Sequence, residues 1–170
     1  DEVLRDTPQA SLEAMALDLA SLASSEDFTD AFQHERLDGL CNNAGVMAIP
    51  RRETADGFEM QLGTNHLGHF ALTARLWPRL VETPGARVVN VSSLMHRVGR
   101  MRFDDLMGER RYEKWSAYGQ SKLANLLFTF ELKRRSEAAG TRGVVAAAHP
   151  GYAATNLQQV GPEMSGSSFM

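Results

Sequence analysis

Short apolar runs alternate with longer segments of helical periodicity along this chain of 170 residues. Such alternation is typical of βαβ units and predicts an α/β fold built on an open parallel sheet. The predicted strands are Glu13–Leu19, Leu37–Asn42, Arg87–Val91 and Gly143–Ala148. The predicted helices are Ser21–His34, most of Thr54–Leu80, and the segment from Ser116 to Ala139. In the first helix, Ser24 and Asp27 have the spacing of a capping box.

The composition is that of an ordinary globular protein, and the length suits one domain, residues 1–170. Hydrophobic residues make up 43% of the chain, charged residues 23%, and the net charge is −3. Arginines gather at Arg97–Arg102 and Arg110–Arg111, but acidic residues interrupt them, which favours a solvated loop and predicts no nucleic-acid partner. No apolar run approaches the roughly 18 residues that a membrane span requires.

Cysteine and histidine predict neither a disulfide nor a metal site. The single cysteine, Cys41, cannot form an internal disulfide and lies in an apolar run, so we expect a core thiol in a reducing, cytoplasmic compartment. His66 and His69 are three positions apart in a predicted helix, which is a possible spacing for metal ligands. Because no cysteine or carboxylate cluster completes such a site, we predict no metal.

Small and polar residues follow each predicted strand where the strand ends. In an open parallel sheet, ligands bind in the crevice beyond the carboxyl ends of the strands. Strands commonly end in turn-forming residues for purely structural reasons, so no single end is informative. All four ends together predict a binding site at this edge, lined by Asp18, Asn42-Asn43-Ala44-Gly45, Ser92-Ser93 and Pro150-Gly151.

Tyr118 and Lys122 stand four residues apart at the start of the last predicted helix. This spacing places the phenol and the ammonium on one face, one turn apart. A free tyrosine titrates near pH ~10, but a nearby cation favours phenolate and moves the phenol toward the working range of a general acid–base. The alternative is a half-buried ring beside a solvated amine, without catalytic use.

Asn65 lies in the middle of a predicted helix among apolar residues, where a buried amide is costly unless its hydrogen bonds are made. It is either a core amide bonded to backbone or a functional group. Gly63 and Gly68 flank it, and each costs a helix roughly 1 kcal/mol relative to alanine. We therefore expect other atoms to approach the helix closely at these glycines.

These residues resemble the short-chain dehydrogenase/reductase family across nearly the whole chain. The matching motifs are N-N-A-G at Asn42–Gly45, T-N-H-L-G-H-F around Asn65, V-N-V-S-S ending at Ser93, Y-x-x-x-K at Tyr118–Lys122, and H-P-G followed by Thr155. Y-x-x-x-K alone is a weak signal, whereas all five in this order are highly specific. The F-D-D-L and S-K-L-A-N-L-L-F-T segments resemble the branch that contains retinol dehydrogenases and WW-domain oxidoreductases.

The resemblance implies a Rossmann-type doubly wound sheet and a role for each motif residue. Tyr118 would be the acid–base that exchanges a proton with the substrate oxygen. Lys122 would hold the nicotinamide ribose and lower the Tyr118 pKa, Ser93 would hydrogen-bond the substrate oxygen, and Asn65 would fix a water that links Lys122 to solvent. Hydride transfer itself would belong to the cofactor.

The resemblance also implies an NAD or NADP cofactor, a small alcohol or carbonyl substrate, and a homodimer or homotetramer formed through the helices of Asn65 and Tyr118. The cofactor-binding positions that it implies are Asp18, Leu19, Asn42, Ala44, Gly45, Val91, Tyr118, Lys122, Pro150, Gly151 and Thr155.

Two departures from the family pattern shape what we expect of this chain. The stretch between Ser93 and Tyr118 is longer than usual, as it is in the retinol-dehydrogenase branch, and we interpret the excess at residues 94–114 as a loop beside the active site. The glycine-rich turn that cradles the pyrophosphate is missing, together with the strands around it. We expect the sequence to be part of a longer protein, and we expect the isolated 170 residues to be loosely packed and inactive.

Two other functions share part of the pattern. Nucleotide-sugar epimerases and dehydratases also carry Y-x-x-x-K, but N-N-A-G and T-N-H-L-G-H argue against them. A non-catalytic NAD(P)-sensing or scaffold protein is the other alternative, and the complete set of Asn65, Ser93, Tyr118 and Lys122 argues against it.

Overall fold

The strand Arg87–Val91 (β2) lies at the centre of a parallel sheet. The structure is a computed structural model that describes residues 5–141 and 143–151. β2 pairs with Gly39–Asn42 (β1) on one side and with Val144–Ala148 (β3) on the other, both in parallel. Three of the four predicted strands are therefore confirmed, and the bounds of β2 are those that the sequence predicts.

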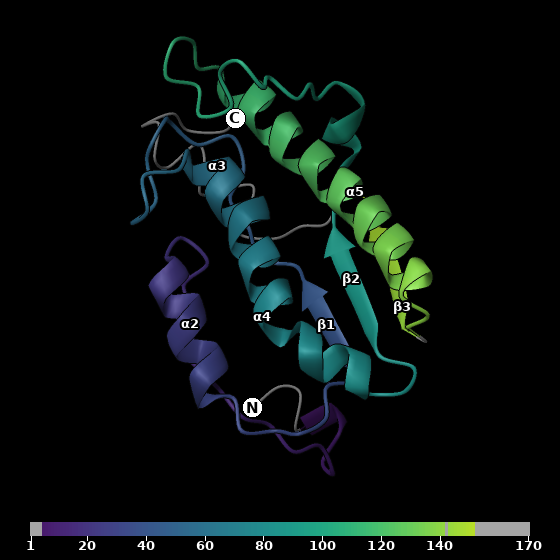
Figure 1. Ribbon diagram of the computed structural model, residues 1–170. Coiled ribbons are helices and arrows are strands. Elements are labelled where there is room, and N and C mark those ends of the chain that lie inside the picture. The colour runs from purple at the N-terminus through teal and green to yellow at the C-terminus, as the bar shows by residue number, and fades with distance from the viewer. Residues whose placement is uncertain (1–4, 142, 152–170) are drawn as a thin grey trace.

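Three helices lie on one side of this sheet (Figure 1): Leu22–Ala31 (α2), Gly68–Glu82 (α4) and Lys114–Ala138 (α5). α4 presents an apolar stripe to the sheet, as the spacing of its leucines requires. The buried core lies between α4 and β2, where Leu72, Leu76 and Leu80 gather with Leu19 and Val88. This packing gives the α/β arrangement that the alternating pattern predicts.

The prediction of a strand at Glu13–Leu19 is wrong. The segment runs without strand pairing into a turn at Leu19 and Ala20, and most of its side chains are exposed. A strand needs a neighbour that supplies backbone hydrogen bonds. Within the described residues β1 pairs on its β2 side alone, so this segment has no sheet partner. Leu19 is the buried residue of the segment, packed in the core against α4.

The first helix begins with a different cap from the predicted one. Its N-cap is Ser21, whose side chain accepts a hydrogen bond from the Ser24 backbone N–H at 3.2 Å. The Ser24 hydroxyl in turn accepts from the Asp18 backbone N–H at 2.9 Å. The predicted capping box of Ser24 and Asp27 is therefore wrong, because Ser21 already satisfies the free N–H groups of the first turn.

The second predicted helix contains a wider turn. It begins at Met60, with Glu59 as N-cap, instead of Thr54. It consists of Met60–Leu62 (α3), a π-helical turn at Gly63–Leu67 (η1), and α4. A Cβ added to Gly63 would lie 2.4 Å from Thr54 Cγ2, and one added to Gly68 would lie 2.3 Å from the Leu19 carbonyl oxygen. The close approach expected at both glycines is confirmed.

The face of the sheet opposite the helices leaves Cys41 exposed. The prediction of a core thiol is wrong because successive strand residues point to opposite faces, and the helices cover the face of Asn42. No element among residues 5–141 and 143–151 covers the Cys41 side. In the same part of the chain, no helix combines the length and the apolar character that crossing a bilayer would require.

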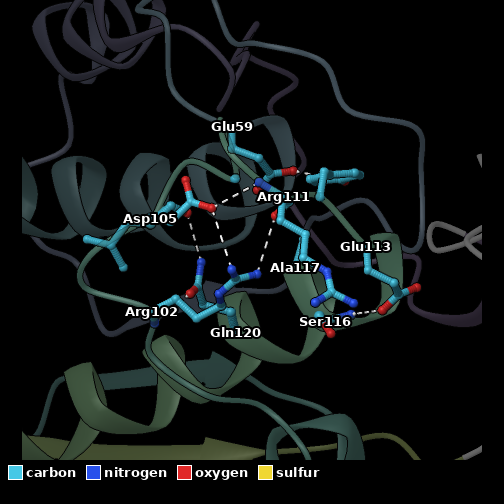
Figure 2. Close-up of a pocket in the computed structure, with 11 residues that line it drawn as sticks. Glu59, Arg102, Asp105, Arg111, Glu113, Ser116, Ala117 and Gln120 are labelled. Atoms are coloured by element: carbon cyan, nitrogen blue, oxygen red, sulfur yellow. Dashed lines mark hydrogen bonds and ion pairs between the residues drawn. The ribbon is translucent and has the colours of Figure 1, made fainter.

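The predicted loop before α5 is held by side-chain contacts to that helix. This loop begins with a short 3₁₀ helix, Leu94–Arg97 (η2). Gln120 on α5 accepts from the Arg102 backbone N–H at 2.9 Å and donates to the Leu106 carbonyl at 2.9 Å. Figure 2 shows Arg102, Asp105 and Gln120 around a small pocket between this segment and α5. Asp105 accepts backbone N–H bonds within the segment, so the segment has a defined conformation.

We predict that Gly68→Ala destabilises the protein by about 1–3 kcal/mol, because the new methyl must displace the Leu19 backbone. This net loss is what remains of the steric cost after alanine returns roughly 1 kcal/mol through helix propensity. Urea denaturation measures the change. Gly39→Ala is the control, because a Cβ there meets nothing within 4 Å. Equal stability of the two variants would contradict the close approach.

Candidate active site

The helix α5 starts at a carboxylate cap that fixes its register. Glu113 accepts hydrogen bonds from the backbone N–H groups of Trp115 and Ser116 at 3.0 and 2.7 Å. Such a cap satisfies free donors of the first turn and complements the helix dipole. It places Tyr118 and Lys122 on successive turns that face β2.

Tyr118 and Lys122 lie on one buried face of α5, as their spacing predicts. Each is 4% exposed. The Lys122 Nζ lies 5.7 Å from the centroid of the Tyr118 ring, and it donates to the Val91 carbonyl at 3.1 Å. The Lys122 amine is therefore not solvated and the Tyr118 ring is more than half buried, whereas the catalytic use of the pair stays a prediction.

Burial dominates the pKa values of both groups. It lowers the pKa of Lys122 to about 8, because the charged ammonium loses water. It raises the pKa of Tyr118 above its ordinary value, although a hydrogen bond with Ser93 works in the opposite direction. The direction for Tyr118 is the reverse of the predicted one: desolvation of the phenolate is the largest cause of the shift, and Lys122 is not among its causes.

The two serines after β2 have different surroundings. Ser92 is buried, and its hydroxyl donates to the Lys122 carbonyl at 2.8 Å, which joins the end of the strand to α5. Ser93 caps η2 through a bond from the Met95 backbone N–H at 3.3 Å, and it is the serine that interacts with Tyr118. The structure therefore brings Ser93, the predicted substrate-binding serine, to the phenol.

Asn65 is a fully buried amide whose hydrogen bonds join three parts of the chain. Its Oδ1 accepts from the Val46 backbone N–H at 2.8 Å, and its Nδ2 donates to the Val46 carbonyl at 2.9 Å. The same Nδ2 donates to the Ser121 hydroxyl at 2.9 Å. The side chain thus connects the π-helical turn, the loop after β1 and α5, and its predicted role toward a water stays a prediction.

The loop after β1 passes directly over Asn65. A Cβ added to Gly45 would lie 2.6 Å from Asn65 Oδ1 and 3.8 Å from Lys122 Nζ. Glycine is therefore required here by close approach, and the backbone at Gly45 lies beside the lysine. Ala44, the preceding residue, is exposed.

The Asn42 side chain points into the layer between sheet and helices, and the predicted contact of this residue with a cofactor stays a prediction. Its Nδ2 donates to the Thr73 hydroxyl at 2.9 Å and to Asn90 Oδ1 at 2.8 Å. Asn90 continues the chain of bonds to Thr129 on α5 at 2.9 Å. The amide of Asn42 is thus a buried link between β1 and the helices, and its side chain does not face the edge where a cofactor would lie.

The other predicted cofactor positions lie in the segments that precede α2 and follow β3. Asp18 is exposed and its carboxylate accepts from the Ala20 backbone N–H at 2.9 Å, whereas the Leu19 side chain belongs to the core. Pro150 and Gly151 are exposed beyond β3. Thr155 lies outside the described residues.

Two residues near the site were not predicted. Asn125, one turn after Lys122, donates from Nδ2 to the same Val91 carbonyl at 3.2 Å. His69 is buried, and its Nδ1 lies 3.0 Å from the Asn65 carbonyl oxygen. The position of Asn125 three residues after Lys122, among apolar helix residues, is a signal that could have identified it.

Comparison with known proteins defines the family of this chain. The short chain dehydrogenase family matches residues 2–165. The chain is 46% identical to mouse retinol dehydrogenase 12 over 158 residues. The aligned region covers 92% of this chain and 49% of the mouse protein. It is 47% identical over 159 residues to human retinol dehydrogenase 13, covering 92% of this chain and 47% of that protein. This chain belongs to the short-chain dehydrogenase family, and it spans about half the length of the curated relatives that it matches.

Solved structures show the same fold. An uncharacterized protein from Mycobacterium paratuberculosis is 47% identical and superposes with a TM-score of 0.79, covering 99% of this chain and 63% of that one. A short-chain dehydrogenase from Sphingobium yanoikuyae, solved with NADPH, superposes with a TM-score of 0.70 at 24% identity, covering 98% of this chain and 60% of that one. The predicted Rossmann-type α/β class and the resemblance to the retinol-dehydrogenase branch are confirmed.

We predict that stability falls as the pH is lowered from 7 to 5, in part because of His69. Burial lowers the pKa of His69 to about 4, so the unfolded chain binds a proton in a range where the folded one does not. Stability from this group is therefore complete above the unfolded pKa and is lost as the pH falls toward 4. The expected loss is about 2 kcal/mol between pH 7 and pH 5.

Urea denaturation at the two pH values measures this effect, with His69→Asn as the matched variant. Asparagine retains an N–H donor near the Asn65 carbonyl but does not titrate. A variant with the same loss of stability as the parent would show that His69 does not cause it.

Proposed function

We propose that the protein is an NAD(P)-dependent oxidoreductase that interconverts an alcohol and a carbonyl compound, with Tyr118 as the acid–base. The observation that carries the proposal is the convergence of Ser93, Tyr118 and Lys122 beyond the end of β2. Parallel sheets place binding sites at this edge. Membership of the short-chain dehydrogenase family supports the same reaction class.

Each side chain has a distinct task in this reaction. Tyr118 gives its proton to the substrate oxygen in reduction and removes it in oxidation, and the Ser93 hydroxyl holds that oxygen beside the phenol. Because burial raises the pKa of Tyr118, the free site keeps the phenol protonated and ready to act as an acid. Lys122, as a cation at neutral pH, stabilises the phenolate that forms when the proton leaves.

The donors at the site fit the ribose of a nicotinamide cofactor. The Lys122 ammonium carries three N–H donors, and by turning from the Val91 carbonyl to the cofactor it would direct two of them to a pair of ribose hydroxyls. The exposed residue Ala44 and the neighbouring Gly45 would adjoin it. When bound, the cofactor supplies hydride transfer. A short-chain dehydrogenase from Burkholderia phymatum solved with NAD and the Sphingobium yanoikuyae structure with NADPH support NAD or NADP as the cofactor.

Exposed apolar side chains flank the two hydroxyls and favour a substrate with an apolar body. Leu94 follows Ser93, and Trp115 packs edge-on against Tyr118 with ring centroids 6.3 Å apart; both are exposed. Burial of such surface by a ligand is favourable. The curated relatives named retinol dehydrogenases support an alcohol of this kind.

Tyr118→Phe in the whole protein tests the assignment. We expect turnover to fall by a factor of roughly 10² or more, the usual contribution of a general acid–base. Binding of NADH or NADPH should stay nearly unchanged, because the ring is retained and Lys122 is intact. Initial rates with a panel of aldehydes and ketones, together with fluorescence titration, measure both. Near-normal turnover would refute the role of Tyr118.

We also propose that a second copy of the protein packs on the outer face of α4 and α5. Phe70, Leu127 and Phe130 are exposed there. The Phe70 and Phe128 rings lie 5.2 Å apart, so apolar side chains of both helices form one surface. Exposed apolar patches of this kind mark interaction sites.

Phe130→Glu tests this surface, with light scattering after size exclusion as the measurement. We expect the assembly to shift to monomers, because a buried unpaired carboxylate opposes association. Phe103→Glu is the control: Phe103 is 78% exposed and Phe130 is 67% exposed, but Phe103 lies in the segment before α5. A monomeric parent protein, or equal effects of both changes, would contradict the proposal.

A further inference from the structure

The Val91 carbonyl at the end of β2 receives two side-chain donors from α5. Lys122 Nζ lies 3.1 Å from its oxygen and Asn125 Nδ2 lies 3.2 Å from it. A carbonyl oxygen has two lone pairs and can accept both. Lys122 and Asn125 are both buried, so they enclose this oxygen together with the helix. One acceptor is thus shared by the lysine of the active site and by an uncharged amide.

The orientation of the Asn125 amide follows from its neighbours. Because a backbone carbonyl can only accept, the amide nitrogen must face Val91 and the amide oxygen must face the other way. Asn125 Oδ1 lies 3.2 Å from His66 Nδ1, so His66 carries its hydrogen on Nδ1 and donates it. His66 belongs to the π-helical turn next to Asn65.

The surroundings of His66 hold its ring in place and keep it neutral. Its ring centroid lies 6.3 Å from that of Phe70 and 5.9 Å from that of Phe128, which packs edge-on. Burial lowers the pKa of His66, although the bond to Asn125 works in the opposite direction. The tautomer with hydrogen on Nδ1 therefore persists at neutral pH and fixes the Asn125 amide.

We propose that Asn125 is a positioning residue that keeps the Val91 carbonyl hydrogen-bonded when Lys122 turns to the cofactor, and that His66 fixes the Asn125 amide for this task. The inference rests on the proposed function of Lys122. A buried carbonyl that loses its donor is costly. If Lys122 were its sole donor, every cofactor-binding event would carry that cost. With Asn125 in place, Lys122 can change partners freely.

The first test replaces Asn125 in the whole protein and measures the Kd of NADH and NADPH by fluorescence titration. Asn125→Leu should raise the Kd about tenfold, or about 1.4 kcal/mol. Asn125→Asp keeps the shape but removes the donor, and its carboxylate would hold the Lys122 ammonium, so it should also raise the Kd. If the leucine variant does not fold, the aspartate variant decides the question.

A double-mutant cycle separates positioning from a merely structural role. In a Lys122→Met background there is no ammonium to change partners, so Asn125→Leu should alter the Kd less than about twofold. A thermal melt of each variant records any loss of stability. An equal change of Kd in both backgrounds would show that Asn125 does not act through Lys122, and it would overturn the proposal.

Substitution of His66 tests the second part. His66→Leu removes the donor to Asn125 and should raise the Kd several-fold, whereas His66→Asn places an amide N–H near the former Nδ1 and should restore affinity to within about twofold of the parent. Equal affinities of the two variants would refute the role of His66. A parent protein that binds neither NADH nor NADPH would refute the proposed function itself, whereas a binding parent with an unaffected Asn125→Leu variant would refute this inference alone.

Discussion

The side-chain amide of Asn65 holds together the parts of the chain that form the site. It bonds both backbone groups of Val46 and the hydroxyl of Ser121 on α5, and the Asn65 side chain and its bond to Ser121 are buried. Breaking one buried bond of this kind costs about 1–3 kcal/mol, because the partner is left without water. The π-helical turn at Gly63–Leu67 is the means by which the helix directs this amide. Such turns are frequent at functional sites because one extra residue redirects a side chain without ending the helix.

Features that depend only on neighbouring residues in the sequence were predicted correctly. Arg87–Val91 is an apolar run bounded by turn residues, and its bounds are confirmed. Tyr118 and Lys122 share a face because helix geometry alone determines their relation. Glu13–Leu19 has an equally apolar pattern, but a strand also needs a partner, and the sequence of a segment does not state whether its partner is present. The prediction that Cys41 is buried was wrong for the same reason, since burial of a sheet face depends on which elements pack against it.

The orientation of polar side chains was harder to predict than their place in the chain. Asn42 was correctly placed at the end of β1, yet its amide faces the helices, because the last strand residue alternates toward the covered face. The Tyr118 pKa depends on how deeply the phenol is buried, which no spacing reveals. Asn125 and His66 lie 59 positions apart and meet through the packing of two helices. Contacts of this kind follow from tertiary structure and not from a motif.

The close approach of Gly45 to the Asn65 amide limits which residues positions 45 and 65 can hold together. A Cβ at position 45 would lie 2.6 Å from Asn65 Oδ1, so a side chain there would need room that a smaller residue at position 65 could give. The N-N-A-G and T-N-H-L-G-H motifs are separate in the sequence but occupy one shared volume. Substitutions at the two positions are therefore sterically coupled: a change tolerated at one depends on the residue at the other.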